Sequence, residues 1–195
     1  AADGQLHVDE IDSSTLICPA VGMLKDIDSG SGSSSPYYLT ALGNTLYFVA
    51  NDGTNGEELW KTDGTTSGTV MVKDIYSGTS SSYPYYLTAV GNTLYFVASD
   101  GTNGAELWKS DGTASGTVMI KDINNASSTS FCCNYATNPI SLTAVGNIIY
   151  FRADDGTNGI ELWKTDGTTS GTVMVKDINS GSGSSSPYYL TAVGN

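Results

Sequence analysis

The sequence predicts an all-β protein, a β-propeller-like array of four-stranded antiparallel blades. Two observations predict it. A long motif recurs with Trp60, Trp108 and Trp163 spaced 48 and 55 residues apart, and a period in this range indicates a propeller, a solenoid or an array. Short runs rich in β-branched and aromatic residues alternate with Gly, Asn and Asp turns, as in antiparallel hairpins. A sustained period of 3.6 residues, which helices require, is not found.

Three copies of the motif are clear, and a fourth is degenerate. Each clear copy contains Glu-Leu-Trp-Lys, a turn Asp-Gly-Thr, and then Lys-Asp-Ile. Lys25-Asp26-Ile27 lies 48 residues before Lys73-Asp74-Ile75, but Asp12 stands where the Trp is expected. We expect one domain of about four repeats, namely 1–44 (degenerate), 45–92, 93–147 (with a linker insertion) and 148–195.

Each repeat offers four short strands, in one copy 86–91, 93–98, 105–109 and 117–123. The segment 93–98 is apolar on both faces, whereas a sheet with one wet face alternates apolar and polar residues. Burial on both faces fits blades packed face to face around an axis. The alternative arrangement is an open stack of β units, a fibre-like array.

The strand count leaves the ring incomplete. Three complete blades are expected. The remainders at the two ends of the chain together make a further blade that lacks one strand, and an exposed sheet edge is costly. Three interpretations stay open: the chain belongs to a longer repeat protein, another subunit donates the strand, or residues 3–9 fill the gap.

The phrase Glu-Leu-Trp-Lys-Thr/Ser-Asp-Gly-Thr-x-x-Gly-Thr resembles the ELWxxDGT repeats of secreted and cell-surface bacterial proteins. The resemblance covers residues from about 45 onward strongly and 1–44 weakly. It implies a propeller-like fold and an extracellular or surface location, but no particular activity. The turn is also similar to the structural Asp-box turns of sialidase-like propellers, whose Arg-rich catalytic set is absent from this sequence.

Charge excludes several partners. The chain carries 20 acidic and 8 basic residues, a net charge of -12. This argues against nucleic acid and against anionic membrane surfaces, both of which attract basic proteins. The sequence has no run near the roughly 20 apolar residues that span a bilayer. The start at Ala1-Ala2-Asp3 fits a processed secreted protein or a cut fragment.

The sequence does not favour an enzyme. It contains one histidine, His7, and the acidic residues recur alike in each repeat, whereas a catalytic pair is unique. No cofactor is expected, although calcium is possible, because Asp and Asn in short loops supply the oxygen ligands that hard cations prefer. The same residues also suit tight turns. The calcium candidates are Asp52, Asn55, Asp100, Asn103, Asp155 and Asn158.

Three cysteines, Cys18, Cys132 and Cys133, form an odd set. We expect Cys18 and the Cys132-Cys133 pair on opposite rims, so a bridge between them would join two subunits. A Cys132–Cys133 bridge and free thiols remain open as alternatives. Asn125 begins a glycosylation sequon.

Tyr-Tyr pairs recur at 37–38, 85–86 and 188–189 and are expected either to pack between blades or to stack on sugars. Together these features predict a non-catalytic extracellular structural or adhesive repeat protein. It would associate with other copies of itself, and a head-to-tail fibre formed by strand donation is one form of that association. The alternative is a multivalent carbohydrate-binding lectin with one shallow site per repeat, and a hydrolase ranks third.

Overall fold

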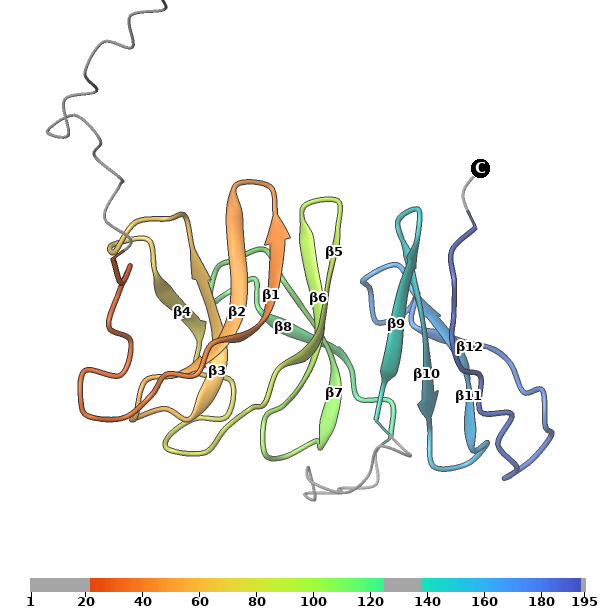
Figure 1. Cartoon of the computed structure of the whole chain (residues 1–195). Helices are drawn as coiled ribbons and strands as arrows, with labels where there is room; N and C mark the ends of the chain where they lie inside the picture. The colour runs from red at the N-terminus through yellow and green to blue at the C-terminus, as the bar shows by residue number, and fades with distance from the viewer. Residues whose placement is uncertain (1–21, 125–137, 194–195) are drawn as a thin grey trace, which may run out of the picture.

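The computed structural model describes residues 22–124 and 138–193, and within these ranges it contains twelve strands and no helix (Figure 1). The strands form three antiparallel sheets of four, each in chain order. Sheet 1 comprises β1 (Tyr37–Leu42), β2 (Thr45–Asn51), β3 (Glu57–Thr62) and β4 (Val70–Lys73). Sheet 2 comprises β5 (Tyr85–Val90), β6 (Thr93–Ser99), β7 (Ala105–Ser110) and β8 (Val118–Lys121). Sheet 3 comprises β9 (Ile140–Val145), β10 (Ile148–Asp154), β11 (Ile160–Thr165) and β12 (Val173–Lys176).

The all-β prediction and the four-stranded antiparallel unit are therefore confirmed. In the described residues no helix is long and apolar enough to cross a membrane.

The hairpins explain why these segments become strands. In every sheet the second and third strands place a Phe opposite the Trp of the repeated motif, as with Phe96 and Trp108. Such aromatic cross-strand pairs stabilise an antiparallel ladder. The two-residue turn between β1 and β2 begins with Gly43 at a φ of 60°, a conformation that costs glycine little. Local sequence therefore selects both the pairing and its register.

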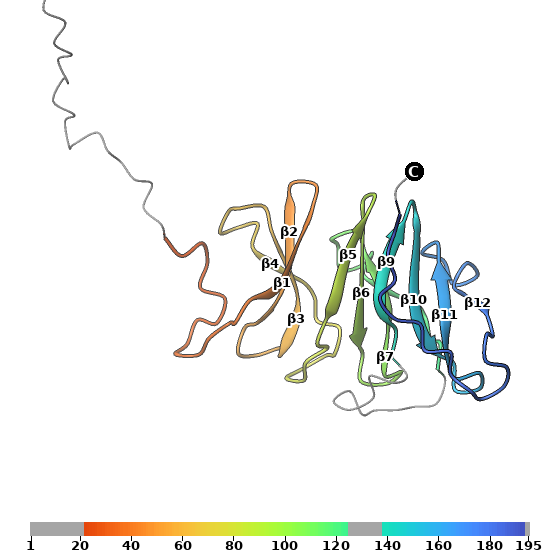
Figure 2. The ribbon, with the colours of Figure 1, turned by 45° about the vertical axis from the view of Figure 1, so that its right-hand side comes forward.

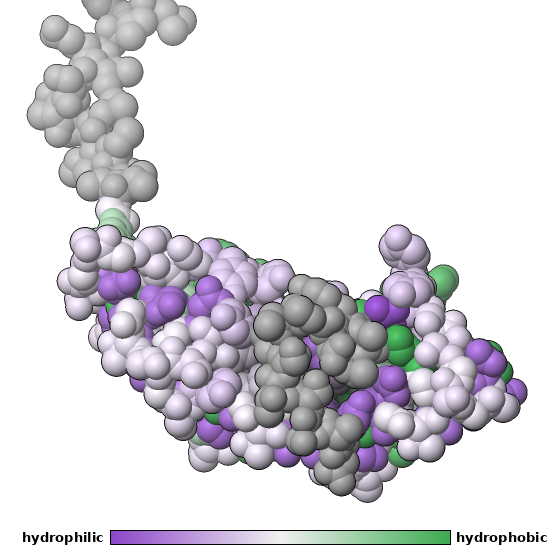
Figure 3. Space-filling view, turned by 90° about the horizontal axis from the view of Figure 1, so that it is seen from below, coloured by the Kyte–Doolittle hydropathy of each residue, from purple (hydrophilic) through white to green (hydrophobic). Residues whose placement is uncertain are grey.

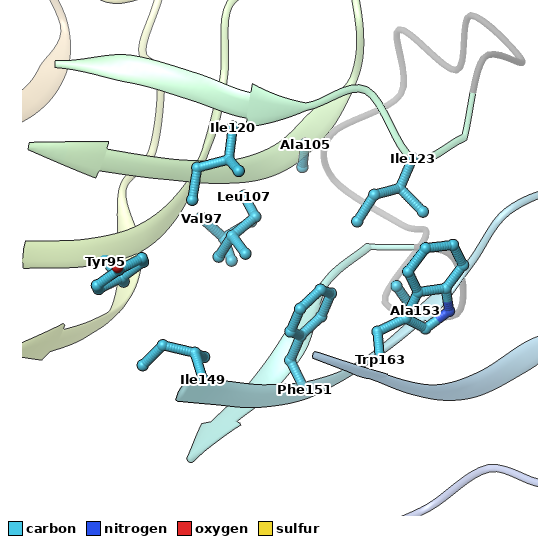
Figure 4. Close-up of a cluster of buried hydrophobic side chains, with 10 residues drawn as sticks. All are labelled: Tyr95, Val97, Ala105, Leu107, Ile120, Ile123, Ile149, Phe151, Ala153 and Trp163. Carbon is cyan, nitrogen blue, oxygen red and sulfur yellow. The ribbon is translucent and has the colours of Figure 1, made fainter. Parts of the chain in front are cut away.

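Sheet 2 is buried on both faces, as its sequence predicts. One face packs against sheet 1 and the other against sheet 3, as the alternation of side chains along a strand requires. In Figure 4, Ile149 and Phe151 of sheet 3 face Val97 and Leu107 of sheet 2. The joint between sheets 1 and 2 is formed by Tyr47, Leu59, Val72, Ile75, Leu94, Phe96, Ala98 and Trp108. The joint between sheets 2 and 3 is formed by Tyr95, Val97, Ala105, Leu107, Ile120, Ile123, Ile149, Phe151, Ala153 and Trp163.

The predicted propeller is wrong in two respects: among the residues that the structure describes, the sheets are not closed into a ring, and there are three sheets, not four. They lie in an open row, with β1 beside β5 and β5 beside β9 (Figures 1 and 2). The degenerate first repeat contributes β1, but its residues 22–36 form no strand. Residues 177–193 at the other end form none either. The row is thus nearer to the open stack of β units than to a propeller.

The matched isoleucines Ile123 and Ile178 predict a stability difference. Ile123 is 8% exposed in the joint between sheets 2 and 3, whereas Ile178, its counterpart on sheet 3, is 59% exposed. We expect Ile123→Ala to lower the free energy of unfolding by about 2–5 kcal/mol. Ile178→Ala should change it by no more than about 0.5 kcal/mol.

Urea unfolding of both variants in dilute solution measures this difference. Equal losses for the two substitutions would contradict the assignment of the buried joint.

Candidate functional site

The Asp-Gly-Thr-Asn-Gly turn holds the calcium candidates of each sheet. In sheet 1, Asp52 Oδ1 accepts hydrogen bonds from the amides of Thr54 and Asn55 at 2.9 and 2.7 Å. Its Oδ2 accepts one from Asn55 Nδ2 at 2.7 Å. The same three bonds recur with Asp100 and Asn103 and with Asp155 and Asn158. Each predicted pair is therefore brought together, and both oxygens of its carboxylate hold the turn.

These turns supply one carboxylate each and lie in separate sheets. Among the residues the structure describes, no group of three or more His, Cys, Asp or Glu side chains is placed to hold a metal ion. Burial acts to raise the pKa of Asp52, but hydrogen bonds from Asn55 outweigh it and hold the pKa below its ordinary value. The pKa values of Asp100 and Asp155 are lowered in the same way by Asn103 and Asn158.

Several residues singled out in the sequence lie outside the described residues. They are His7, Cys18, Asn125, Cys132 and Cys133.

Each sheet contains a buried glutamate that was not predicted from the sequence. It is the Glu of Glu-Leu-Trp-Lys, and Glu58 in sheet 1 is 0% exposed. Glu58 Oε1 accepts a hydrogen bond from the amide of Ser82 at 2.9 Å, and Oε2 accepts one from the amide of Ile75 at 3.0 Å. Ser82 Oγ also donates to Oε2. The carboxylate therefore ties the chain that leaves β4 back to β3, and alternation from the buried Trp60 was the signal that marked Glu58 as an inward position.

The same glutamate titrates differently along the row. Burial raises the pKa of Glu58 to about 7, and burial raises that of Glu106 to about 8. For Glu161 in sheet 3, burial again acts upward, but hydrogen bonds from Ser185 and from the amide of Ile178 outweigh it and lower the pKa. The group that bonds Glu161 is more exposed than its counterparts. Ile178 is 59% exposed, whereas Ile75, which bonds Glu58, and Ile123, which bonds Glu106, are 6% and 8% exposed.

One tyrosine of each pair is exposed in a strained backbone. Tyr38, Tyr86 and Tyr189 have φ values of 53°, 54° and 55°, a region that bulky residues rarely adopt. They are 53%, 41% and 95% exposed. In β1 and β5 the ladder register is interrupted at this point. In β9 the equivalent residue is Ser141, also at positive φ. Backbone strain of this kind often marks a functional position.

In two of the three pairs the other tyrosine is partly buried, and in the third pair it is exposed. Tyr37 OH donates to Glu57 Oε2 at 2.8 Å, Tyr85 packs on the cluster between sheets 2 and 3, and Tyr188 lies over Arg152. Tyr85 therefore fits the expected packing between sheets, whereas Tyr188 is 59% exposed. Stacking on sugars stays a prediction. The repeated residues Trp60, Trp108 and Trp163 are each 6% exposed and belong to the core.

Lysine–carbonyl bonds recur at each joint between sheets. Lys61 Nζ of sheet 1 donates to the carbonyl of Gly112 in sheet 2 at 2.7 Å, and Lys109 donates to Gly167 in sheet 3 at 2.8 Å. Lys73 Nζ donates to Thr117 at 2.8 Å and lies 5.7 Å from the centre of the Trp108 ring. These bonds fix the position of each sheet on its neighbour.

The lower face of the molecule carries the Asp-Gly-Thr-Asn-Gly turns and the serine-rich linkers. Seen from below, its described part is mostly white and pale purple, with several patches of stronger purple and small green areas (Figure 3). The described part of this face therefore shows no extended apolar patch.

No known family model matches the chain, and no curated protein matches it. The resemblance to ELWxxDGT proteins therefore rests on the motif in this sequence alone.

The buried glutamates predict a pH dependence of stability. The pKa values of Glu58 and Glu106 are raised from an ordinary 4.5 to about 7 and about 8. Between pH 4.5 and these raised pKa values, the folded chain therefore binds more protons than the unfolded chain. The free energy of unfolding should therefore fall as pH rises from about 5 to 8. The lowered pKa values of the turn aspartates have the opposite sign, because that stabilisation is lost as pH falls below about 4.

Denaturant unfolding from pH 3 to 9, with carboxyl titration by NMR, measures both the expected loss of stability above pH 5 and the expected loss below pH 4. A free energy of unfolding that rises steadily from pH 5 to 8 would contradict the assigned directions.

The turn glycines predict a second stability difference. Gly64 and Gly112 occupy equivalent turns with φ values of 89° and 88°. A Cβ at Gly64 meets nothing, whereas a Cβ at Gly112 meets the Tyr47 hydroxyl of the neighbouring sheet. Gly64→Ala should cost about 1 kcal/mol from backbone strain. Gly112→Ala should cost about 1–3 kcal/mol more, because the joint must open. Thermal unfolding of the two variants makes the comparison, and equal midpoints would contradict this account of the joint.

Proposed function

We propose that this chain is a non-catalytic extracellular structural or adhesive repeat protein that associates head to tail with copies of itself. One observation carries the proposal. The polar groups that recur in every sheet are engaged in holding turns and joints, as Asp52 and Glu58 show. Such groups serve the architecture, and their repetition supports a scaffold over a single reaction centre.

The two unlike ends of the row support self-association. The outward face of sheet 1 is covered by the chain's own residues, since Ile27 packs with Phe48 and Trp60. The outward face of sheet 3 exposes Val175 and Ile178 at 46% and 59%. Contacts between unlike ends are heterologous, and such contacts generate open chains when the rotation does not close.

Composition and charge support the expected location and partners. A net charge of -12 disfavours nucleic acid and anionic membranes as partners. The extracellular location rests on the resemblance to secreted repeat proteins and on the polar, weakly charged composition.

Mass measurement and negative-stain microscopy of the same native sample test the proposal. We expect the purified chain, of 20.3 kDa, to form filaments. Particles that stay monomeric up to high concentration would overturn the proposed assembly.

A lectin is the second candidate, and the row of strained tyrosines favours it. Tyr38, Tyr86 and Tyr189 present exposed rings at equivalent positions, and flat rings of this kind stack on the apolar faces of sugars. A glycan-array signal that free sugar competes away, and that Tyr86→Ala weakens, would favour the lectin. Filaments without sugar affinity would favour the scaffold.

A further inference from the structure

The C-terminal segment occupies the place of a first strand on sheet 3. Thr143 Oγ1 of β9 donates to the carbonyl of Leu190 at 3.2 Å, as Thr40 Oγ1 of β1 donates to Leu87 of β5 at 3.4 Å. Residues 186–193 therefore lie against sheet 3 as β5 lies against sheet 1, although they pair with no second strand among the described residues.

Arg152 secures this segment. It stands where sheets 1 and 2 have Val49 and Val97, and its guanidinium carbon lies 4.0 Å from the centre of the Tyr188 ring. A stacked guanidinium over a tyrosine ring is a favourable contact. The first strand of a further sheet is thus already seated at this end of the row.

The N-terminal segment occupies the place of a last strand on sheet 1. Lys25 Nζ donates to the carbonyl of Thr69 at 2.7 Å, just as Lys73 Nζ donates to Thr117 at 2.8 Å. Thr66 Oγ1 donates to the carbonyl of Leu24 at 2.8 Å. The matching bond at the joint between sheets 2 and 3 joins Thr169 and Ile120 at 2.7 Å. Residues 22–28 therefore act as the end of a preceding sheet, at the opposite end of the row (Figure 1).

Apolar side chains that pack at the internal joints are exposed at both ends. Val175 and Ile178 are 46% and 59% exposed, whereas Ile120 and Ile123 in the same places on sheet 2 are 4% and 8% exposed. At the other end Met23 is 77% exposed. Its counterparts Met119 and Met174 pack into the clusters that join each sheet to the preceding one.

We infer that a second copy of this chain docks on sheet 3, placing its Met23 against Val175 and Ile178 of the first copy. At the two internal joints the equivalent Val or Ile side chains share a cluster with the methionine, phenylalanine and tryptophan of the next sheet, and the second copy supplies the methionine of that set. Residues 22–28 of the second copy then lie on sheet 3 as the β12 region lies on β8 of sheet 2.

This inference rests on the proposed head-to-tail association and names its contact surface. The contact is heterologous, so one copy uses its Met23 end and its neighbour uses its Ile178 end. Repetition of this contact adds copies to the row in one direction.

Complementation between two variants tests the inference. Met23→Glu blocks one end of a copy and Ile178→Glu blocks the other. Each variant alone should associate about 100-fold more weakly than the wild type, because an unpaired carboxylate would be desolvated in the contact. Both replaced side chains are exposed, so each variant should keep the wild-type circular dichroism spectrum and unfolding midpoint.

An equimolar mixture of the two variants should form dimers and nothing larger, as measured by analytical ultracentrifugation. In that mixture the wild-type Ile178 of one variant meets the wild-type Met23 of the other. Thr102→Glu, on an exposed turn of sheet 2, adds the same charge away from the contact and should assemble like the wild type.

The outcomes separate the two proposals. If the wild type assembles and either end variant assembles equally well, or if the mixture stays monomeric, this contact surface is wrong while the scaffold proposal stands. If the wild type stays monomeric at every concentration, head-to-tail association and this contact both fail. A Thr102→Glu variant that loses assembly would attribute the effect to net charge and also overturn the inference.

Discussion

Burial of each sheet on both faces is the constraint on which the rest of the structure depends. A strand such as β6, with Phe96 on one face and Val97 on the other fully buried, needs a neighbouring sheet on each side. Sheet 2 has two such neighbours, and the sheets at the ends have one each. The chain meets this demand at sheet 1 with residues 22–36, and at sheet 3 it leaves part of the face uncovered. The row is therefore built from one repeating interface between sheets, and part of the same interface is exposed on sheet 3.

Polar groups make that interface geometrically specific. A purely apolar joint tolerates sliding, because hydrophobic burial has no preferred direction. The lysine–carbonyl bonds across each joint fix how one sheet sits on the next. Within each sheet the glutamate carboxylate, Glu58 in sheet 1, fixes the chain that leaves the last strand. Both do so because hydrogen bonds require short distances and alignment. The turn aspartates have the same role at the rim, where Asp52 orders the loop between β2 and β3. Acidic residues that resemble ligands in the sequence are thus engaged in local structure.

Local sequence predicted the strands but not their assembly. The predicted segments 93–98 and 105–109 differ from β6 and β7 by one residue at the end, because Gly and Asp turns mark hairpin boundaries. Ring closure could not be predicted, since it depends on the angle between packed sheets and on whether the chain ends meet. The contrast between Ile123 and Ile178 was also invisible: both follow Lys-Asp, and only the neighbouring sheet decides their exposure. The role of Glu58 was missed because an acidic residue in a strand suggests a wet face.

The open row also has a consequence for local unfolding. In such a linear array each unit gains stability from its immediate neighbours, so cooperativity weakens toward the ends. Sheet 2 has a joint on each face, and its opening requires both to break. Sheet 3 opens by breaking one. Amide protons of β6 and β7 should therefore exchange with solvent most slowly, and those of β11 and β12 should exchange sooner, a gradient of protection set by position in the row and not by sequence.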